Sequence, residues 1–236
     1  NTGDYARAAG AKNDYEDISW VLYPNDSTPA GRELRLKQEY LLVSASLQDL
    51  VARHLREGGR IEQLGRRNTV HLNDTHPALA PAELLRILMD DHGIDRISAW
   101  RITRQALSYT NHTLLPEALE TWPVQMLARL LPRHMELIYE INERFLADVR
   151  RRFPGDEALV QRVSLIDEAQ GRRVRMAGLA IVASHKVNGV AALHSRLMTE
   201  TIFADYARLY PQRFFNVTNG VTPRRWLQQA NPGLAS

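Results

Sequence analysis

The chain contains no cysteine among its 236 residues. It therefore forms no disulfide and offers no thiolate as a nucleophile or metal ligand, which fits a reducing compartment. No apolar run approaches the roughly 20 residues that a membrane-spanning helix needs. The first residues show neither the basic nor the apolar segment of a signal peptide. These absences predict a cytoplasmic protein that has no membrane partner.

Several signatures of catalysis and of nucleotide binding are also missing. The sequence has no G-x-G-x-x-G, no P-loop, no H-E-x-x-H and no G-x-S-x-G. Its histidines show no ligand-like pairing beyond His71 with His76, so we expect no metal site. The net charge of +3 is small, and acidic residues are interleaved with basic runs such as Arg150-Arg151-Arg152. This pattern favours solvated helix faces over a nucleic-acid partner.

What is present indicates a globular protein with a helix-rich α/β fold. A chain of this length can bury a sizeable core in one or two domains, and a hydrophobic content of 44% is ordinary. Strand patterns alternate with longer helical patterns, which is typical of α/β folds. Helices are predicted over 5–18, 32–56, 81–93, 100–106, 116–122, 134–152, 177–184 and 193–210, and strands over 69–72, 107–109, 163–166, 173–176 and 214–217. The strands 163–166 and 173–176 are expected to form a hairpin across Gln170-Gly171.

Three polar clusters follow predicted strands. They are Asn73-Asp74-Thr75-His76-Pro77, the segment 109–117, and the segment 216–226. Each combines Asn, His or Thr with a proline or glycine that restricts the backbone. A ligand with many hydroxyl groups needs many short donors and acceptors that converge on one cavity, so the clusters indicate a binding site.

The residue pattern alone also allows simpler interpretations. Asn73 and Asp74 could cap the helix after Pro77, and the pattern does not separate this from a binding role. A lone histidine such as His112 is more often a core or turn residue. The segment 23–31 could be a plain surface turn.

The clusters, together with Leu22-Tyr23-Pro24-Asn25-Asp26, resemble the α-glucan phosphorylase family from about residue 3 to residue 233. The resemblance covers the middle of such an enzyme, and the chain does not begin with methionine, as a fragment often does not. It implies the later half of the N-terminal domain of a two-domain, glycosyltransferase-B-like (Rossmann-like) fold. Residues 1–22 would form a dimer-contact helix, 23–31 a gate loop and 32–236 the α/β body, with the C-terminal cofactor domain absent.

The resemblance implies phosphorolysis. Inorganic phosphate would release α-glucose-1-phosphate from maltodextrin or glycogen, both α-1,4-glucans, with retention of configuration. The family carries pyridoxal 5′-phosphate on a lysine of its C-terminal domain, and Lys12, Lys37 and Lys186 do not match that lysine. We therefore expect no cofactor on this chain and no activity from it alone, although Trp226 matches an aromatic residue of the cofactor pocket.

The resemblance also implies roles for individual residues and an assembly. His112 would be catalytic, because the matching histidine holds the glucosyl unit and its carbonyl faces the anomeric carbon. Asp74 and His76 would hold the glucan on the far side of the cleaved bond, and Asn219 would contact a glucose hydroxyl. The helix within residues 1–22 would contact the partner subunit of a homodimer.

The gate loop and its neighbours complete the expected site. Asn25 and Asp26 would gate the active site by moving. Tyr23 and Arg35 match residues beside the path of the oligosaccharide, where an aromatic face suits a sugar ring.

Two other functions remain open at this point. A glycoside hydrolase could use a carboxylate pair such as Asp74 and Glu117. A non-catalytic carbohydrate-binding module would explain why no cofactor lysine is found.

Overall fold

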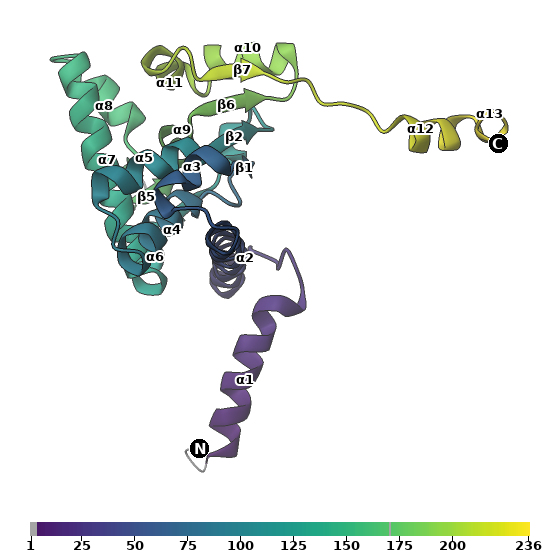
Figure 1. Ribbon diagram of the computed structural model, residues 1–236, viewed down its shortest axis with the longest axis horizontal. Coiled ribbons are helices and arrows are strands. Elements are labelled where there is room, and N and C mark those ends of the chain that lie inside the picture. The colour runs from purple at the N-terminus through teal and green to yellow at the C-terminus, as the bar shows by residue number, and fades with distance from the viewer. Residues whose placement is uncertain (1–3, 170) are drawn as a thin grey trace.

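The computed structural model describes residues 4–169 and 171–236. Residues 1–3 of the predicted dimer-contact segment and Gln170 of the predicted hairpin turn lie outside the described residues. Figure 1 shows an α/β body from which one helix projects at the N-terminus and two short helices project at the C-terminus.

A four-stranded parallel sheet organises the body. Its strands are β1 (Val70–Asn73), β2 (Leu107–Asn111), β6 (Lys186–Gly189) and β7 (Phe214–Asn216), in the order β1-β2-β6-β7. Because the strands are parallel, their carboxyl ends meet at one edge, where open α/β sheets bind ligands. The sheet therefore brings the three polar clusters of the sequence to one edge. The sequence did not predict β6, because the strand offers only one large apolar residue, Val187.

The helix α9 (Met176–Ala183) lies at the centre of the core and packs against β2. All eight of its residues are buried. Small residues allow the close packing, since a Cβ on Gly178 would lie 2.5 Å from the hydroxyl of Tyr206. This agrees with the tightly packed helix predicted over 177–184.

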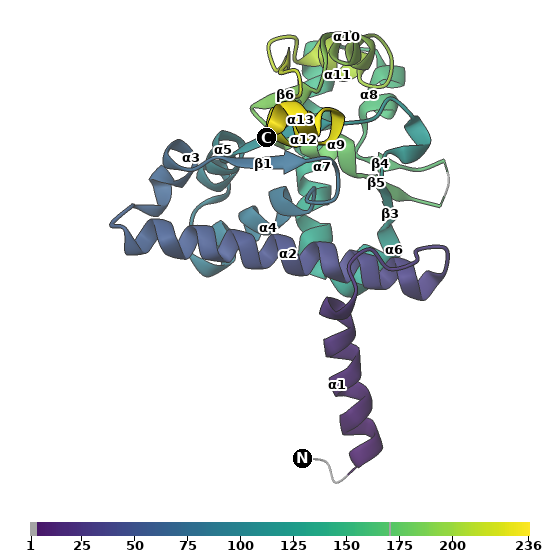
Figure 2. The ribbon, with the colours of Figure 1, turned by 90° about the vertical axis from the view of Figure 1, so that its right-hand side faces the viewer.

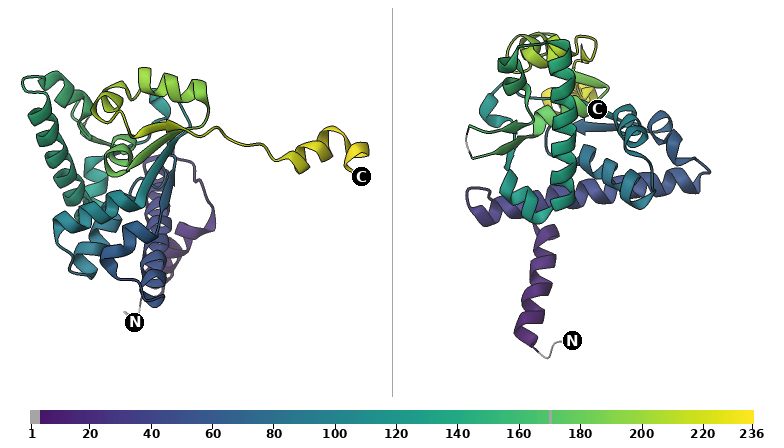
Figure 3. Two further views of the ribbon diagram at one scale, coloured as in Figure 1. Left: turned by 45° about the horizontal axis from the view of Figure 1, so that its top comes forward. Right: turned by 90° about the vertical axis from the view of Figure 1, so that its left-hand side faces the viewer.

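Longer helices surround this centre. The helix α4 (Ala80–Arg86), which continues as the π-helical turn η2 (Ile87–Asp91), packs against α9, against α2 (Pro29–Arg56) and against α7 (Pro132–Arg152). The predicted apolar stripe of α7 is buried, and it comprises Met135, Ile138, Ile141, Phe145 and Val149. Figures 2 and 3 show α2 running along the base of the body and α7 rising from it.

The segment before β2 is also helical. The helix α5 (Arg96–Ala106) begins where the side chain of Asp95 accepts hydrogen bonds from the backbone N–H groups of Ile97 and Ser98. The short helices η1 (Ile61–Gln63) and α3 (Leu64–Arg67) pack against α5. The strand β2 follows α5 directly, so the chain runs from helix to sheet without a loop.

A second sheet contains the predicted hairpin. Strand β4 (Ile166–Asp167) pairs antiparallel with β5 (Arg173–Arg175), which confirms the pairing, and β3 (Thr121–Pro123) joins on the other side. Val163 belongs instead to the helix α8 (Glu157–Val163). The helix predicted over 116–122 is wrong beyond η3 (Pro116–Ala118), since Trp122 is buried in β3, and α6 (Val124–Leu130) follows.

The single helix predicted over 193–210 is two helices, α10 (Ala192–Glu200) and α11 (Ala204–Leu209). Thr201 breaks the helix with φ −123° and ψ −94°. The break turns Phe203 inward, where its ring meets the rings of Tyr109 and Tyr206 edge-on. Packing of one aromatic residue therefore outweighs the local helix preference.

Both ends of the described chain project from the body. The helix α1 (Tyr5–Trp20) stands apart in Figures 1 and 2, two residues longer than predicted. An extended arm carries α12 (Pro223–Ala230) and α13 (Pro232–Ala235), which were not predicted, and every residue from 217 onward is exposed. In the described part of the chain, no helix combines the length and apolar character that crossing a membrane requires.

Candidate functional site

The carboxyl edge of the parallel sheet contains an open hollow of about 410 Å³. We call it the strand-end hollow. His112 from the second polar cluster and Asn219 from the third both line it, as predicted for a shared site. The full lining comprises His71, Asn73, Thr110, His112, Asn188, Phe215, Val217, Thr218, Asn219 and Gly220.

A chain of hydrogen bonds crosses the sheet beneath this hollow. The Nδ1 atom of His71 lies 2.9 Å from the Oγ of Ser108, and its Nε2 contacts the Oγ1 of Thr110. Asn188 donates from Nδ2 to Thr110 Oγ1 at 3.2 Å and accepts at Oδ1 from the backbone N–H of Val217 at 2.7 Å. These hydrogen bonds link β1, β2, β6 and the residue after β7, so they fix the polar groups at the sheet edge.

His112 is held in place by the end of the neighbouring strand. Its Nε2 donates to the Oδ1 of Asn73 at 2.6 Å, and the side chain is otherwise exposed to the hollow. Partial burial lowers the pKa of His71, and the adjacent His112 lowers it further. A neutral His71 lets the two imidazoles lie near one another without repulsion.

Asp74 adopts a backbone conformation that L-amino acids rarely use, with φ +70°. Its N–H donates to Thr110 O at 3.0 Å, and its Oδ1 accepts from Thr75 N at 2.6 Å. Strained backbone of this kind costs on the order of 1 kcal/mol and is concentrated at functional sites. The alternative that Asn73 and Asp74 cap the next helix is wrong, because α4 begins at Ala80 without a side-chain cap.

A second pocket, of about 160 Å³, lies between α2 and the loop after β1. Tyr23, Arg35 and His76 line it together, and the rings of Tyr23 and His76 meet edge-on with centroids 6.5 Å apart. We call it the gate pocket. The structure thus brings together three of the residues that the sequence assigned to the glucan path. The loop after β1, which carries both Asp74 and His76, connects this pocket with the strand-end hollow.

Arg35 binds three carboxylates beside the gate pocket. Its guanidinium lies 3.0 Å from Asp26 of the gate loop, 3.3 Å from Glu39 and 2.9 Å from Glu120. Burial raises the pKa of Glu39, and the carboxylate of Glu120 raises it further, against the attraction of Arg35. A protonated Glu39 leaves the positive charge of Arg35 to be shared between Asp26 and Glu120. We call these four residues the Arg35 cluster.

The gate loop is folded tightly onto the start of α2. Asn25 Oδ1 accepts from Ser27 N at 3.0 Å, and Thr28 Oγ1 accepts from Gly31 N at 3.1 Å. A Cβ on Gly31 would lie 1.7 Å from the carbonyl oxygen of Asn25, so this contact requires glycine. The helix α2 begins at Pro29 and not, as predicted from the sequence, at residue 32. Thr28 is its N-cap, and a proline at the first helical position is the sequence signal for this start.

Trp226 does not join these residues. It lies on α12 with 60% of its surface exposed, and it lines neither the strand-end hollow nor the gate pocket. Neither Asp74 nor Glu117 lines either cavity, so these two carboxylates do not form the pair that a hydrolase would need in either one.

Sequence reasoning missed Asn188, which lines the hollow, and His194, which contacts the strand β2 just before His112. The Nε2 of His194 lies 3.1 Å from the backbone oxygen of Asn111, next to His112. The signal available was the run Asn188-Gly189 after a valine, which places an amide and a flexible backbone at a strand end. A Cβ on Gly189 would lie 2.3 Å from the Oγ of Ser195, so this glycine is needed for packing.

The described residues do not fit a pyridoxal 5′-phosphate site. Lys12 pairs with Glu16 on the exposed helix α1, Lys37 pairs with Glu33, and Lys186 donates to the backbone oxygen of Gln212 at 3.0 Å. None of these lysines lines the strand-end hollow or the gate pocket. Within residues 4–169 and 171–236, no cluster of three or more His, Asp or Glu side chains could hold a metal ion.

The sequence was compared with protein families and with known proteins. The sequence profile of the family described as "Carbohydrate phosphorylase" matches residues 1–236. The chain is 56% identical to a glycogen phosphorylase of Haemophilus influenzae over 236 residues, which are 100% of this chain and 29% of that protein. It is 51% identical to a glycogen phosphorylase of Synechocystis over 236 residues, again the whole chain, and 28% of that protein.

The similarity extends to animals. The brain form of glycogen phosphorylase from Homo sapiens is 50% identical over 243 residues, covering 100% of this chain and 29% of the human protein. The chain thus spans less than a third of the length of these relatives, and it matches them throughout its own length. The family profile and the relatives agree with the α/β fold and the parallel sheet. The chain belongs to the carbohydrate phosphorylase family.

Proposed function

We propose that the chain is the glucan-binding part of an α-1,4-glucan phosphorylase. Such an enzyme uses inorganic phosphate to release α-glucose-1-phosphate from maltodextrin or glycogen with retention. The observation that carries the proposal is the convergence of His112 and Asn219 in the strand-end hollow, in a chain whose relatives are named glycogen phosphorylases. Relatives named glycogen phosphorylases favour this function over the alternative of a non-catalytic carbohydrate-binding module.

The strand-end hollow would hold the glucosyl unit that is transferred. His112, oriented by Asn73, and Asn219 on its loop present donors and acceptors to sugar hydroxyls. The reaction passes through a state in which positive charge develops at the anomeric carbon. Fixed dipoles at the hollow stabilise that charge without reorganising.

The gate pocket would hold the following glucose units. Tyr23 and His76 supply ring faces and edges, and Asp74 lies on the same loop as His76. Asn25 and Asp26 lie on the gate loop, which is attached to the body through the ion pair of Asp26 with Arg35. Release of that pair would let the loop move and admit the chain of sugars.

Pyridoxal 5′-phosphate would act in the full-length enzyme, where its phosphate supplies acid–base chemistry to the attacking inorganic phosphate. The lysine that binds it would lie outside these residues, and we expect the chain alone to be inactive. Trp226, on the exposed arm, would join the cofactor pocket only when other parts of the protein cover the arm.

The decisive experiment measures glucan cleavage by the full-length protein with and without phosphate. Glucose-1-phosphate should appear from maltoheptaose only when phosphate is present. Free glucose released without phosphate would support a glycoside hydrolase instead.

The variant His112→Ala should lower turnover in the same assay by about 10²–10³, because an oriented contact is lost. Its free energy of unfolding should be nearly unchanged. A loss of folding stability of several kcal/mol would show that His112 is structural.

We further propose that the enzyme is a cytoplasmic homodimer in which α1 contacts the partner subunit. At the end of α1 the side chains of Trp20, Val21 and Leu22 are 74%, 62% and 56% exposed. A helix that stands apart from its own domain gains little by packing there and would be marginal alone. Sedimentation of the full-length protein at micromolar concentration should show a dimer, and a Trp20→Ser variant should shift it toward monomer. A clean wild-type monomer contradicts the proposal.

A further inference from the structure

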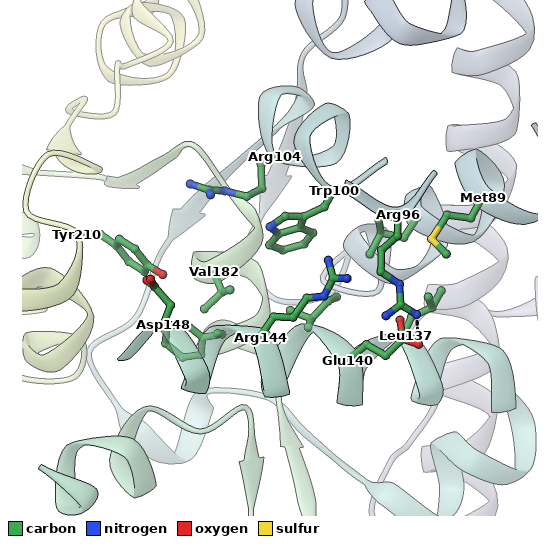
Figure 4. A pocket seen from close by; sticks show the side chains of 13 residues that line it. Met89, Arg96, Trp100, Arg104, Leu137, Glu140, Arg144, Asp148, Val182 and Tyr210 are labelled. Atoms are coloured by element: carbon green, nitrogen blue, oxygen red, sulfur yellow. Dashed lines mark hydrogen bonds and ion pairs between the residues drawn. The ribbon is translucent and has the colours of Figure 1, made fainter. Parts of the chain in front are cut away.

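A third cavity, of about 250 Å³, lies between α5 and α7 and is floored by Val182 of α9. It shares no lining residue with the strand-end hollow or the gate pocket. We call it the α5–α7 pocket. Aromatic rings and charged side chains line it together, among them Trp100, Arg104, Arg144, Glu140, Asp148 and Tyr210. Figure 4 shows Trp100 between the two arginines, with Arg104 of α5 extending toward Tyr210 and Arg144 of α7 on the other side of the indole ring.

The two carboxylates of this pocket are already neutralised. Glu140 forms an ion pair with Arg96, and Asp148 pairs with Arg151 and Arg152. These cations take up the negative charge of the pocket walls.

Arg104 and Arg144 have no such partner. Neither forms an ion pair or a hydrogen bond within the described residues, and the Nε of Arg104 is fully buried and unsatisfied. A buried donor without a partner is costly, and a cationic one is more so. The pocket therefore holds two positive charges for which the described chain supplies no anion.

The surroundings of Arg104 are also electropositive. Burial, together with the smaller effect of the charge of Arg104, lowers the pKa of Arg213 to about 10. The guanidinium of Arg213 lies 3.6 Å from the centre of the Tyr210 ring, so this cation is turned against the aromatic wall instead of a carboxylate. A compact anion would relieve the repulsion among these side chains.

The walls of the pocket also favour an anion that carries a flat, apolar ring. Trp100 offers an indole face, and Leu85, Leu137 and Val182 make the deeper surface apolar. Ligand sites typically combine such an apolar lining with a few fixed charges. We propose that the α5–α7 pocket binds a phosphate monoester carried on a flat ring, with Arg104 as the main donor to the phosphate, Arg144 as the second cation and Trp100 against the ring.

Isothermal titration calorimetry of the full-length protein with phenyl phosphate tests this proposal. Phenol and inorganic phosphate each carry half of the recognised chemistry, so both should bind at least about tenfold more weakly than phenyl phosphate. Benzoate separates a carboxylate from a phosphate, and it should be weaker because it carries one negative charge for two arginines. Tighter binding of benzoate would overturn the choice of phosphate.

Variants assign the binding to this pocket. Arg104→Gln should weaken phenyl phosphate about tenfold or more, because a charge-assisted hydrogen bond is lost. Trp100→Leu should weaken phenyl phosphate and leave inorganic phosphate unchanged. Arg101→Gln is the matched control, since Arg101 is an exposed arginine on the same helix that does not line the pocket. Equal loss in Arg101→Gln, or unchanged affinity in Arg104→Gln, overturns the proposal, as does an absence of binding at millimolar ligand.

Thermal unfolding separates a ligand site from a structural role for Arg104. A structural arginine would lower the unfolding midpoint when replaced, whereas Arg104→Gln should leave the midpoint unchanged or raised, because no protein contact is lost. Phenyl phosphate should raise the midpoint of the wild-type protein and of Arg101→Gln, but not that of Arg104→Gln. A lowered midpoint in Arg104→Gln with unchanged phenyl phosphate affinity would assign Arg104 to the fold.

Discussion

The buried carboxylate of Glu83 and the buried carboxylates of the Arg35 cluster differ in how well they are hydrogen-bonded. Glu83, on α4, is fully buried and is bound by Ser44 at 2.7 Å, His134 at 2.6 Å, and Arg86 at 2.8 and 3.0 Å. In the Arg35 cluster, one oxygen of Glu39 and one of Glu120 are buried without a hydrogen-bond partner.

The difference is visible in the pKa values. Burial alone would raise the pKa of Glu83, but the hydrogen bonds from His134, Arg86 and Ser44 outweigh it and lower that pKa to about 2. The pKa of Glu39 is raised, because burial and the nearby Glu120 outweigh the attraction of Arg35. The carboxylate of Glu83 is thus hydrogen-bonded at both oxygens, whereas the Arg35 cluster beside the gate loop has two buried carboxylate oxygens without a hydrogen-bond partner.

The largest effect should come from breaking the Glu83 network. Glu83→Gln leaves Arg86 and His134 without their buried counter-charge, and such a loss destabilises a fold by about 3 kcal/mol or more. Urea unfolding measures it. Glu143→Gln, an exposed carboxylate on α7, is the control and should change the free energy of unfolding by less than about 0.5 kcal/mol. Equal, small effects in both variants would remove the distinction between the two groups of carboxylates.

Acid should weaken the same network in a defined window. The folded-state pKa of Glu83 lies below its unfolded value of 4.5, so its contribution is complete above about pH 4.5 and is lost as the pH falls toward 2. Wild-type stability should therefore drop between these pH values more steeply than that of Glu83→Gln. Parallel curves for the two proteins would show that Glu83 does not titrate with folding.

A smaller effect is expected from Glu120→Gln in the Arg35 cluster. This substitution leaves Arg35 with Asp26 and a carboxyl group at Glu39 whose pKa then falls, so the cluster loses one partner but keeps its net charge balance. The free energy of unfolding should fall by about 1 kcal/mol, the order of a single hydrogen bond. A loss as large as that of Glu83→Gln would show that the Arg35 cluster is part of the structural core.

The smallest change in the free energy of unfolding should come from Glu39→Gln, and at pH 7 this variant should not be destabilised, unlike the two variants above. The folded-state pKa of Glu39 is raised, so its stabilising contribution is complete below the unfolded pKa and is lost as the pH rises through the folded pKa. At pH 7 the glutamine should therefore be neutral or stabilising by up to about 1 kcal/mol, and its advantage should disappear near pH 4. Thermal unfolding at the two pH values measures the difference, and a destabilised Glu39→Gln at pH 7 would contradict it.

Sequence reasoning predicted the parts of this structure that depend on local pattern. The apolar stripe of α7 and the strands before the polar clusters follow from periodicity, and the convergence of the second and third clusters on one hollow follows from their positions at strand ends. The position of β6 could not be predicted in this way, because a four-residue strand with one large apolar side chain has no hydrophobic pattern. The break at Thr201 depends on the distant ring of Tyr109, and no local signal encodes it.

The site shows the same limit. Asn188 and Val217 lie 29 positions apart, and only the order of strands in the sheet joins them. Likewise the Arg35–Glu120 pair spans 85 positions, so the sequence indicated Arg35 as a site residue without revealing its partner. Trp226 remains a prediction, because its surroundings in the described chain are solvent.

The contact between Gly31 and the carbonyl oxygen of Asn25 has a mechanical consequence. Together with the Thr28 cap and the hydrogen bonds from Arg32 to the carbonyl oxygens of Asp26 and Ser27, it clamps the later half of the gate loop onto α2. Rotation is then concentrated at the other end, near Tyr23, whose φ of +59° is already strained. A motion of the gate loop would therefore turn at Tyr23, in the non-helical segment that joins the loop to the end of α1 at Trp20.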